Sequence, residues 1–305
     1  MIMSRISPLI LLIGIAPWLT GCFTGIESTP AITDREVQRA SAPTSPDDNY
    51  LSSVLPTPVR ELKRGALWVV NDSRIDRVFG AEAHGLTFTP GDTLTFESLR
   101  KVTTLDGRTV GEALFVTQRA DTLCYRVNKS YDELMADSSM TIPFATEGAL
   151  IDKTAALVGG KEFYVITASR FDTAGQACTG RKFVPVKVQS VGYGNGYYPL
   201  SLTLLDDCGE SFKLFMSVGS GSVMPRKFGS LLSLTNPRAQ YPTITDEVWQ
   251  HIINGTTVAG MTQPECRLAL GRPSDIVRQV GYSSLVEVWT YADGKRLIFA
   301  DGILQ

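Results

Sequence analysis

Between residues 65 and 234, apolar and polar positions mostly alternate, or the apolar residues form short runs that end at turn residues. This pattern is typical of β-strands, because successive side chains of a strand point to opposite faces of the sheet. Asp106-Gly107 and residues 206–209 separate neighbouring strand-like segments and predict tight hairpin turns. Many short strands joined by turns predict small β-barrels or β-sandwiches in this region.

Two nine-residue segments in this region resemble each other and indicate a duplication. Residues 68–76 read Trp-Val-Val-Asn-Asp-Ser-Arg-Ile-Asp, and residues 164–172 read Tyr-Val-Ile-Thr-Ala-Ser-Arg-Phe-Asp. We therefore predict two related β modules, residues 58–130 and 155–236, joined by a linker at 131–154. The shared serine, arginine and aspartate predict a structural arginine–carboxylate bond in each module; a duplicated ligand site is the alternative.

Residues 243–305 predict two helices followed by strands. Apolar residues within 246–253 recur at the spacing of one helix face, and Gly255 is a natural helix stop. Thr262 and Glu265 have the spacing of a capping box at the start of a second helix. Three strand-like segments follow, at 276–280, 286–291 and 296–300.

The N-terminus carries an apolar run from Leu9 to Leu19 behind a single charged residue, Arg5. The run is too short to cross a bilayer, which needs about 20 apolar residues. A positive start followed by a short apolar stretch is typical of a secretory signal peptide. We expect this signal peptide to occupy residues 1–21.

The end of this run, Leu19-Thr20-Gly21-Cys22, resembles a bacterial lipobox. The resemblance implies that Cys22 carries a diacylglyceryl group on its sulfur and becomes the N-terminus of the mature protein. An ordinary signal peptide with a chance cysteine is the alternative. Residues 22–57, rich in Ser, Thr, Pro, Asp and Ala, are then expected to form a lipidated tether, with a docking peptide that orders on a partner as the alternative.

The C-terminal segment resembles the BamE-like (SmpA/OmlA) domain of outer-membrane lipoproteins over about a fifth of the chain. The residues that carry the resemblance are Ile253, Gly255, Gly260-Met261-Thr262, Leu270-Gly271, Pro273, Trp289-Thr290-Tyr291, Leu297-Ile298-Phe299 and Asp301-Gly302. Members of this family include a small accessory subunit of the β-barrel assembly machinery, and similar folds occur in secreted inhibitor proteins. The resemblance implies a helix-helix-three-strand domain at 243–305.

The fold class expected from these patterns is therefore α+β, with two tandem small β-barrel- or sandwich-like modules followed by a BamE-like domain. The net charge of −2 offers no electrostatic basis for nucleic-acid binding. The chain has only two histidines and contains neither a Gly-x-Ser-x-Gly elbow nor a Cys-x-x-Cys pair. We accordingly expect no enzymatic activity, no cofactor and no metal.

Two groups of residues are candidates for chemistry or contact. Cys178 and Cys208 lie in one predicted module and could pair as a disulfide in an oxidising compartment. Tyr193, Tyr197 and Tyr198 lie beside glycines in one loop and predict an adaptable contact surface for a protein or a glycan. Packing at a strand edge is the alternative for the tyrosines.

These patterns predict a membrane-anchored envelope lipoprotein that acts as a protein-interaction or scaffold module, with a possible place in outer-membrane assembly or maintenance. A lipoprotein that binds glycan or peptidoglycan, and an inhibitor-like binder of a secreted enzyme, are the alternatives. Phe23 follows Cys22 where an inner-membrane retention aspartate often lies, which by family resemblance favours the outer membrane. We expect the periplasmic face in preference to the cell surface, and an envelope protein as the partner.

Overall fold

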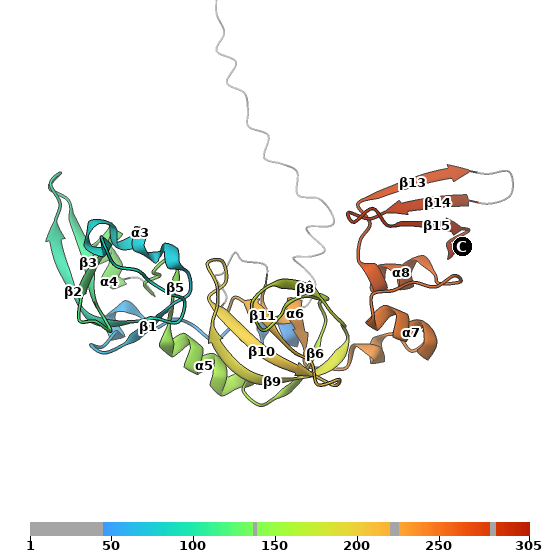
Figure 1. Cartoon of the computed structure of the whole chain (residues 1–305), viewed down its shortest axis with the longest axis horizontal. Coiled ribbons are helices and arrows are strands. Elements are labelled where there is room, and N and C mark those ends of the chain that lie inside the picture. The colour runs from blue at the N-terminus through green and yellow to red at the C-terminus, as the bar shows by residue number, and fades with distance from the viewer. Residues whose placement is uncertain (1–44, 137–138, 220–225, 281–284) are drawn as a thin grey trace, which may run out of the picture. The chain divides into compact units, whose positions relative to one another are not determined.

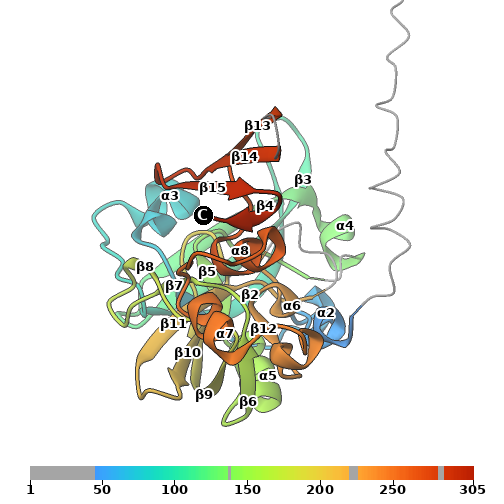
Figure 2. The ribbon, with the colours of Figure 1, turned by 90° about the vertical axis from the view of Figure 1, so that its right-hand side faces the viewer.

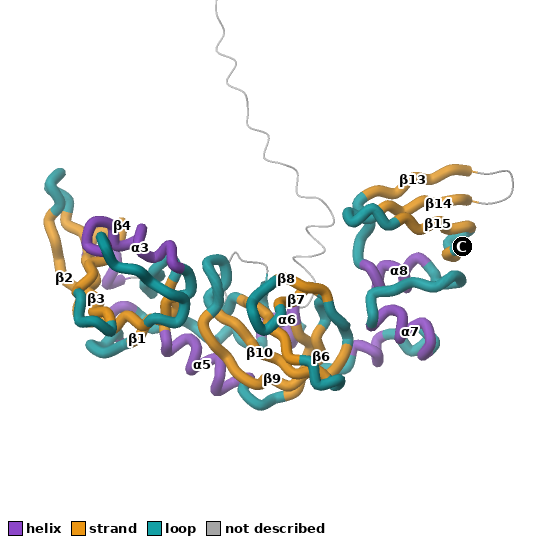
Figure 3. The backbone as a smooth tube through the Cα atoms, viewed as in Figure 1, coloured by secondary structure: helices purple, strands orange, loops and turns teal. Residues whose placement is uncertain are grey.

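A computed structural model of the chain describes residues 45–305, with gaps at 137–138, 220–225 and 281–284. Within these residues the strands form three antiparallel sheets, of five, seven and four strands (Figure 1; Figure 3). The predicted signal peptide 1–21 and the lipobox, with Leu19, Thr20, Gly21 and Cys22, lie outside the described residues.

The five-stranded sheet is built around an aromatic core. In spatial order its strands are β4 (Thr122–Ser130), β3 (Thr109–Thr117), β2 (Thr93–Thr103), β1 (Leu67–Val70) and β5 (Ala145–Glu147). Trp68, Phe96 and Phe115 have ring centroids 5.3 to 6.0 Å apart. Buried residues join this core from α3 (Asp76–Phe79), α4 (Tyr131–Ala136) and the 3-10 helices Val59–Glu61, Ser73–Ile75 and Gly80–Ala83.

The seven-stranded sheet has an aliphatic core. In spatial order its strands are β12 (Leu232–Ser233), β6 (Glu162–Val165), β9 (Val184–Tyr193), β10 (Leu200–Asp206), β11 (Ser211–Met216), β7 (Ser169–Phe171) and β8 (Ala177–Thr179). The buried positions of β9 alternate with exposed ones, as expected for a strand with one face on the core. The helices α5 (Gly148–Val158) and α6 (Phe228–Leu231) add buried leucines to the same core.

The two larger sheets share one strand order. The order β5-β1-β2-β3-β4 in the first sheet corresponds to β12-β6-β9-β10-β11 in the second, and every pairing is antiparallel. Along the chain, the short helix α4 precedes β5 in the first sheet, and the short helix α6 precedes β12 in the second. The second sheet adds the hairpin β7–β8, which pairs with β11. This common topology is the structural counterpart of the sequence similarity between the two regions.

The matching segments themselves diverge after their first residues. Trp68 and Tyr164 both lie in strands, but the Ser-Arg pair that follows begins a 3-10 helix in one copy and forms β7 in the other. Arg74 donates to Asp72 through Nε and Nη2, at 2.9 and 2.6 Å, whereas Arg170 donates to Glu210 at 2.8 Å. An arginine–carboxylate bond therefore exists in both copies, but the acceptors do not correspond.

The C-terminal region contains α7 (Asp246–Ile253), α8 (Gln263–Leu270) and a four-stranded sheet (Figure 2). The strand order is β13 (Asp275–Val280), β14 (Leu285–Thr290), β15 (Arg296–Ala300) and β16 (Ile303–Leu304). The capping box predicted for Thr262 and Glu265 is present at the start of α8. It satisfies backbone donors that have no partner within the first turn of a helix.

The expected fold class, an α+β chain of two barrel- or sandwich-like modules and a helix-helix-three-strand domain, is wrong. The chain is β-rich, with three antiparallel sheets, and its C-terminal region is mostly strands. Among the described residues, no pairing joins β4 to β5 or β8 to β12, so the larger sheets remain open. The fourth C-terminal strand, β16, was not predicted from the sequence. This strand forms because Asp301 and Gly302 adopt positive φ and reverse the chain, which pairs β16 with β15.

Two of the predicted boundaries also need correction. The tether expected at 22–57 is folded from residue 45 onward, where α2 (Pro46–Asn49) leads into the buried side chains of Leu51 and Val54. These few apolar side chains order a segment whose average composition is polar. The linker expected at 131–154 contains α4, β5 and part of α5, and β5 completes the five-stranded sheet.

The packing of residues 45–57 predicts a measurable stability cost on truncation of Leu51. Its side chain is 3% exposed, so Leu51→Ala should lower the free energy of unfolding by about 2–5 kcal/mol through lost burial and a residual cavity. Urea titration followed by circular dichroism would measure this loss. Leu105→Ala, at a fully exposed hairpin position, is the matched control and should change stability by less than about 0.5 kcal/mol. Equal effects of the two variants would show that the segment is not part of the core.

Candidate functional site

The C-terminal sheet has one face whose central side chains are packed in the core. Trp289 of β14 and Phe299 of β15 are buried there, with ring centroids 4.5 Å apart. Cys266 of α8 is buried in the same core, and the Arg267 guanidinium lies 4.8 Å from the Trp289 ring centroid. This inner face holds α8 against the sheet.

A buried carboxylate, Glu287, lies on this inner face. It is 6% exposed and accepts hydrogen bonds from Arg278 Nε at 2.8 Å, Gln263 Nε2 at 3.0 Å and Trp289 Nε1 at 3.1 Å. The bond from Arg278 lowers the pKa of Glu287 below its ordinary value, and the bond from Trp289 adds to this effect. Because Gln263 belongs to α8, the carboxylate also joins the helix to two strands of the sheet.

The opposite, outer face of the same sheet carries a row of apolar side chains that are half-exposed or exposed, beside the polar residues Asp275, Gln279, Thr290 and Arg296. Val277, Val288 and Ile298 are directly paired across β13, β14 and β15. Val277 is 45% exposed and Ile298 is 52% exposed. We call this surface the outer face, and its apolar members are Val277, Val286, Val288, Ile298, Ala300 and Ile303.

Sequence reasoning did not identify the outer face, although one signal for it exists. β14 reads Leu-Val-Glu-Val-Trp-Thr, so alternate positions on both faces are apolar except for Glu287 and the terminal Thr290. Strands that are apolar on both faces are typical of sheets covered on both sides. In addition, β13 is an edge strand of this sheet, so one side of its backbone is open to pairing. An apolar face beside an open edge makes this sheet the candidate interaction surface of the chain.

The predicted contact residues Tyr193, Tyr197 and Tyr198 lie at and after the end of β9. The loop is closed by Asn195, whose Oδ1 accepts from the backbone N–H groups of Tyr197 and Tyr198 at 2.9 Å each. Tyr197 is 70% exposed, whereas Tyr193 and Tyr198 are partly buried. One tyrosine of the three therefore presents most of its ring to solvent.

The rest of this tyrosine loop packs against the five-stranded sheet. Thr146 Oγ1 donates to the carbonyl of Pro199 at 2.6 Å. Gly196 approaches the Asp72–Arg74 ion pair so closely that a Cβ there would lie 2.5 Å from Arg74 Nη2. Much of the loop thus serves an internal contact, through the carbonyl of Pro199 and the backbone at Gly196.

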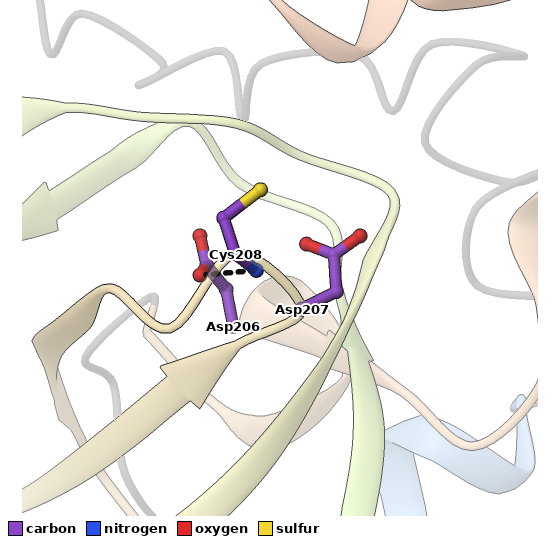
Figure 4. A group of neighbouring side chains, drawn as sticks. All are labelled: Asp206, Asp207 and Cys208. Carbon is purple, nitrogen blue, oxygen red and sulfur yellow. Dashed lines mark hydrogen bonds between the residues drawn. The ribbon is translucent and has the colours of Figure 1, made fainter.

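Cys178 and Cys208 are both free and exposed in the structure. Cys178 lies in β8, and Cys208 lies in the turn between β10 and β11, next to Asp206 and Asp207 (Figure 4). Arg181 Nη1 donates to Asp207 Oδ1 at 2.6 Å and to Cys208 Sγ at 2.8 Å. The structure therefore brings Cys208 to an arginine, not into a disulfide with Cys178.

The same turn is the one described group whose ligand atoms are close enough for a metal ion, within 4.8 Å of one another. Asp206 Oδ1, however, accepts from the backbone N–H groups of Cys208 and Glu210, at 3.0 and 2.9 Å. The Arg181 guanidinium already supplies positive charge to the other two ligand groups. The geometry is that of a side-chain-capped turn closed by an ion pair.

Among the described residues, no helix has the length and apolar character that crossing a membrane requires. The comparisons of the chain with protein-family models, with curated proteins and with solved structures find no match.

The buried carboxylate predicts a pH dependence of stability. Because the folded state holds the pKa of Glu287 below the ordinary 4.5, its contribution is fully present above about pH 4.5 and is lost as the pH falls through the folded-state pKa. Glu287→Gln should lower the free energy of unfolding at neutral pH by about 1.5–3 kcal/mol, the worth of hydrogen bonds to a charged group. The free energy of unfolding of the variant should also decrease less than that of the wild type as the pH is lowered.

Urea midpoints measured at several pH values would test this prediction. Glu162→Gln, at an exposed position of β6, makes the same chemical change elsewhere and should leave the profile unchanged. If the Glu287→Gln profile has the same slope as the wild-type profile below pH 4.5, Glu287 does not carry the effect.

The exposure of the cysteines predicts that two thiols react rapidly with a thiol reagent in the folded protein. In a Cys22→Ser background, Cys178 and Cys208 should react rapidly with Ellman's reagent because both are exposed. Cys266 should react only on unfolding, because burial, with a smaller effect of Glu265, raises its pKa to about 11. Cys178→Ser and Cys208→Ser should each remove one fast thiol. Fast thiols that appear only after reduction would instead support the predicted disulfide.

Proposed function

We propose that this chain is a membrane-anchored envelope lipoprotein that docks a protein partner through its C-terminal sheet. The observation that supports the proposal is the apolar outer face, in which Val277, Val288 and Ile298 run across three strands. Exposed apolar surface that is contiguous across a sheet marks interaction sites in soluble proteins. The lipobox-like segment ending at Cys22 supplies the membrane anchor in this proposal.

The partner that fits this surface is a second envelope protein that offers an extended apolar strand. Main-chain groups of such a strand pair with the open edge of β13, and alternate side chains lie on the outer face. Burial of one Val or Ile side chain contributes about 1.5–3 kcal/mol, so the two most exposed members alone form a substantial anchor. We place the protein on the periplasmic face of the outer membrane, and a role in outer-membrane assembly or maintenance would follow from the partner.

A second candidate function, glycan or peptidoglycan binding, is favoured by Tyr197 alone. Its ring is 70% exposed on a loop closed by Asn195, which is the kind of aromatic platform that sugar rings stack on. Pulldown on peptidoglycan with Tyr197→Ala tests it, and unchanged recovery would rule this function out.

The docking proposal is tested by crosslinking and affinity purification from detergent-solubilised membranes. Val277→Lys combined with Ile298→Lys should reduce recovery of the partner at least about tenfold, because two charges would be buried in the contact. Leu67→Lys is the matched control, since Leu67 is 48% exposed on β1 of another sheet, and it should leave recovery unchanged.

Two outcomes would overturn the proposal. Equal recovery with the double variant and the wild type would show that the partner binds elsewhere. Capture of tagged by untagged copies of this chain, lost in the double variant, would show that a second copy covers the outer face.

A further inference from the structure

A cavity of about 770 Å³ lies away from the C-terminal sheet. Its walls come from the segment before the first 3-10 helix, from β1, from β5 and the residues before it, from the start of α5, and from the residues after β11. All of these elements belong to one compact unit, residues 44–305. Cavities of about 300–1,000 Å³ are the size that small organic ligands occupy.

The lining is mainly apolar. Its large apolar members are Leu55, Pro56, Pro58, Trp68, Met140, Ile142, Leu150, Pro199 and Val218. Leu55 is 50% exposed, so part of the apolar lining is open to solvent. A ligand with a long hydrocarbon chain would cover it.

The charged groups of the lining are Lys153 and Glu147, and they differ in how they are engaged. Glu147 is buried and its Oε2 accepts from the backbone N–H of Thr57 at 3.0 Å. Lys153 is exposed, and its Nζ donates to the carbonyl of Leu55 at 3.0 Å. An ammonium group has three donors, so Lys153 retains capacity for an anionic ligand group.

A second donor lies in the wall beside Leu55. Ser217 is buried, and its Oγ has no hydrogen-bond partner within the described part of the chain. The residue two positions further, Gly219, is in contact with Leu55, because a Cβ there would lie 3.2 Å from Leu55 Cδ2. Leu55 thus contacts the ammonium of Lys153 through its carbonyl and Gly219, two positions from Ser217, through its side chain. A buried hydroxyl without a partner costs free energy that a ligand oxygen would recover.

We propose that this cavity binds a long-chain fatty acid, with the hydrocarbon chain against the apolar lining and the carboxylate at Lys153. The carboxylate complements the remaining donors of Lys153, and the Ser217 hydroxyl is a further donor in the same lining. A strand-like peptide fits less well, because β5, the edge strand at the cavity, spans only three residues, Ala145–Glu147. The binding site is separate from the outer face, so its test is independent of protein docking.

The test uses the full chain with Cys22→Ser, so that no lipid is attached. The probe is cis-parinaric acid, a fluorescent long-chain fatty acid, excited by energy transfer from tryptophan, because Trp68 lines the cavity. Saturable binding is expected, with displacement by palmitic acid. Methyl palmitate, which lacks the negative charge, should compete about tenfold less well.

Variants assign the binding to this cavity. Lys153→Gln should weaken the binding of palmitic acid about tenfold and leave the binding of methyl palmitate unchanged. Lys187→Gln, at an exposed position of β9 outside the lining, is the matched control and should change neither. Leu55→Glu should weaken both ligands, and its partial exposure lets the chain fold normally, which circular dichroism checks.

Several outcomes would overturn the inference. Binding that does not saturate, equal competition by the acid and the ester, or a Lys153→Gln variant that binds as the wild type does would each exclude a fatty-acid site with its carboxylate at Lys153. Displacement of the probe by an apolar peptide but not by palmitic acid would assign the cavity to a peptide instead.

Discussion

The buried carboxylate of Glu287 is the interaction on which the C-terminal sheet depends. Removing a charge from water costs several kcal/mol, and only its hydrogen bonds, above all that from Arg278, offset this cost. Sliding β14 by one residue would turn Glu287 outward and place Val286 and Val288 on α8. The carboxylate therefore selects the register, and the same register leaves the valines on the outer face. The register of β14 therefore determines both the polar network on the inner face and the apolar surface on the outer face.

The two larger sheets share a strand order even though the sequence motif they have in common adopts different structures. Their five common strands pair in the same order, yet the Ser-Arg segment is a 3-10 helix in one copy and a strand in the other. Arg170 of β7 is buried and its guanidinium lies 4.5 Å from the Phe212 ring centroid, whereas Arg74 remains half-exposed beside Asp72. The strand order is maintained by many backbone bonds and side chains, while an arginine needs only one carboxylate within reach.

Local sequence signals were sufficient to predict those elements whose stabilising contacts join residues close in the sequence. The start of α8 could be predicted because a capping box involves only Thr262 and Glu265, three residues apart. The strand β16 could not, because two residues form a strand only when β15 is already beside them. Residues 45–57 were read as tether because their average composition is polar, and Leu51 becomes a core residue only through distant parts of the chain. The outer face was missed for a similar reason: alternation identifies two faces, but which face is covered depends on where α8 packs.

The packing of the first described residues has a mechanical consequence. The Tyr50 ring packs at a tilt against Phe228 and meets Phe163 edge-on, with ring centroids 4.6 and 5.6 Å away. Asp47 Oδ1 accepts from the backbone N–H of Leu234. The path from the N-terminus therefore enters the fold at the seven-stranded sheet. Tension applied to that end would act on the Tyr50 contacts, which attach this segment to the seven-stranded sheet. The aromatic cluster of Tyr50, Phe163 and Phe228 therefore anchors the start of the folded chain mechanically.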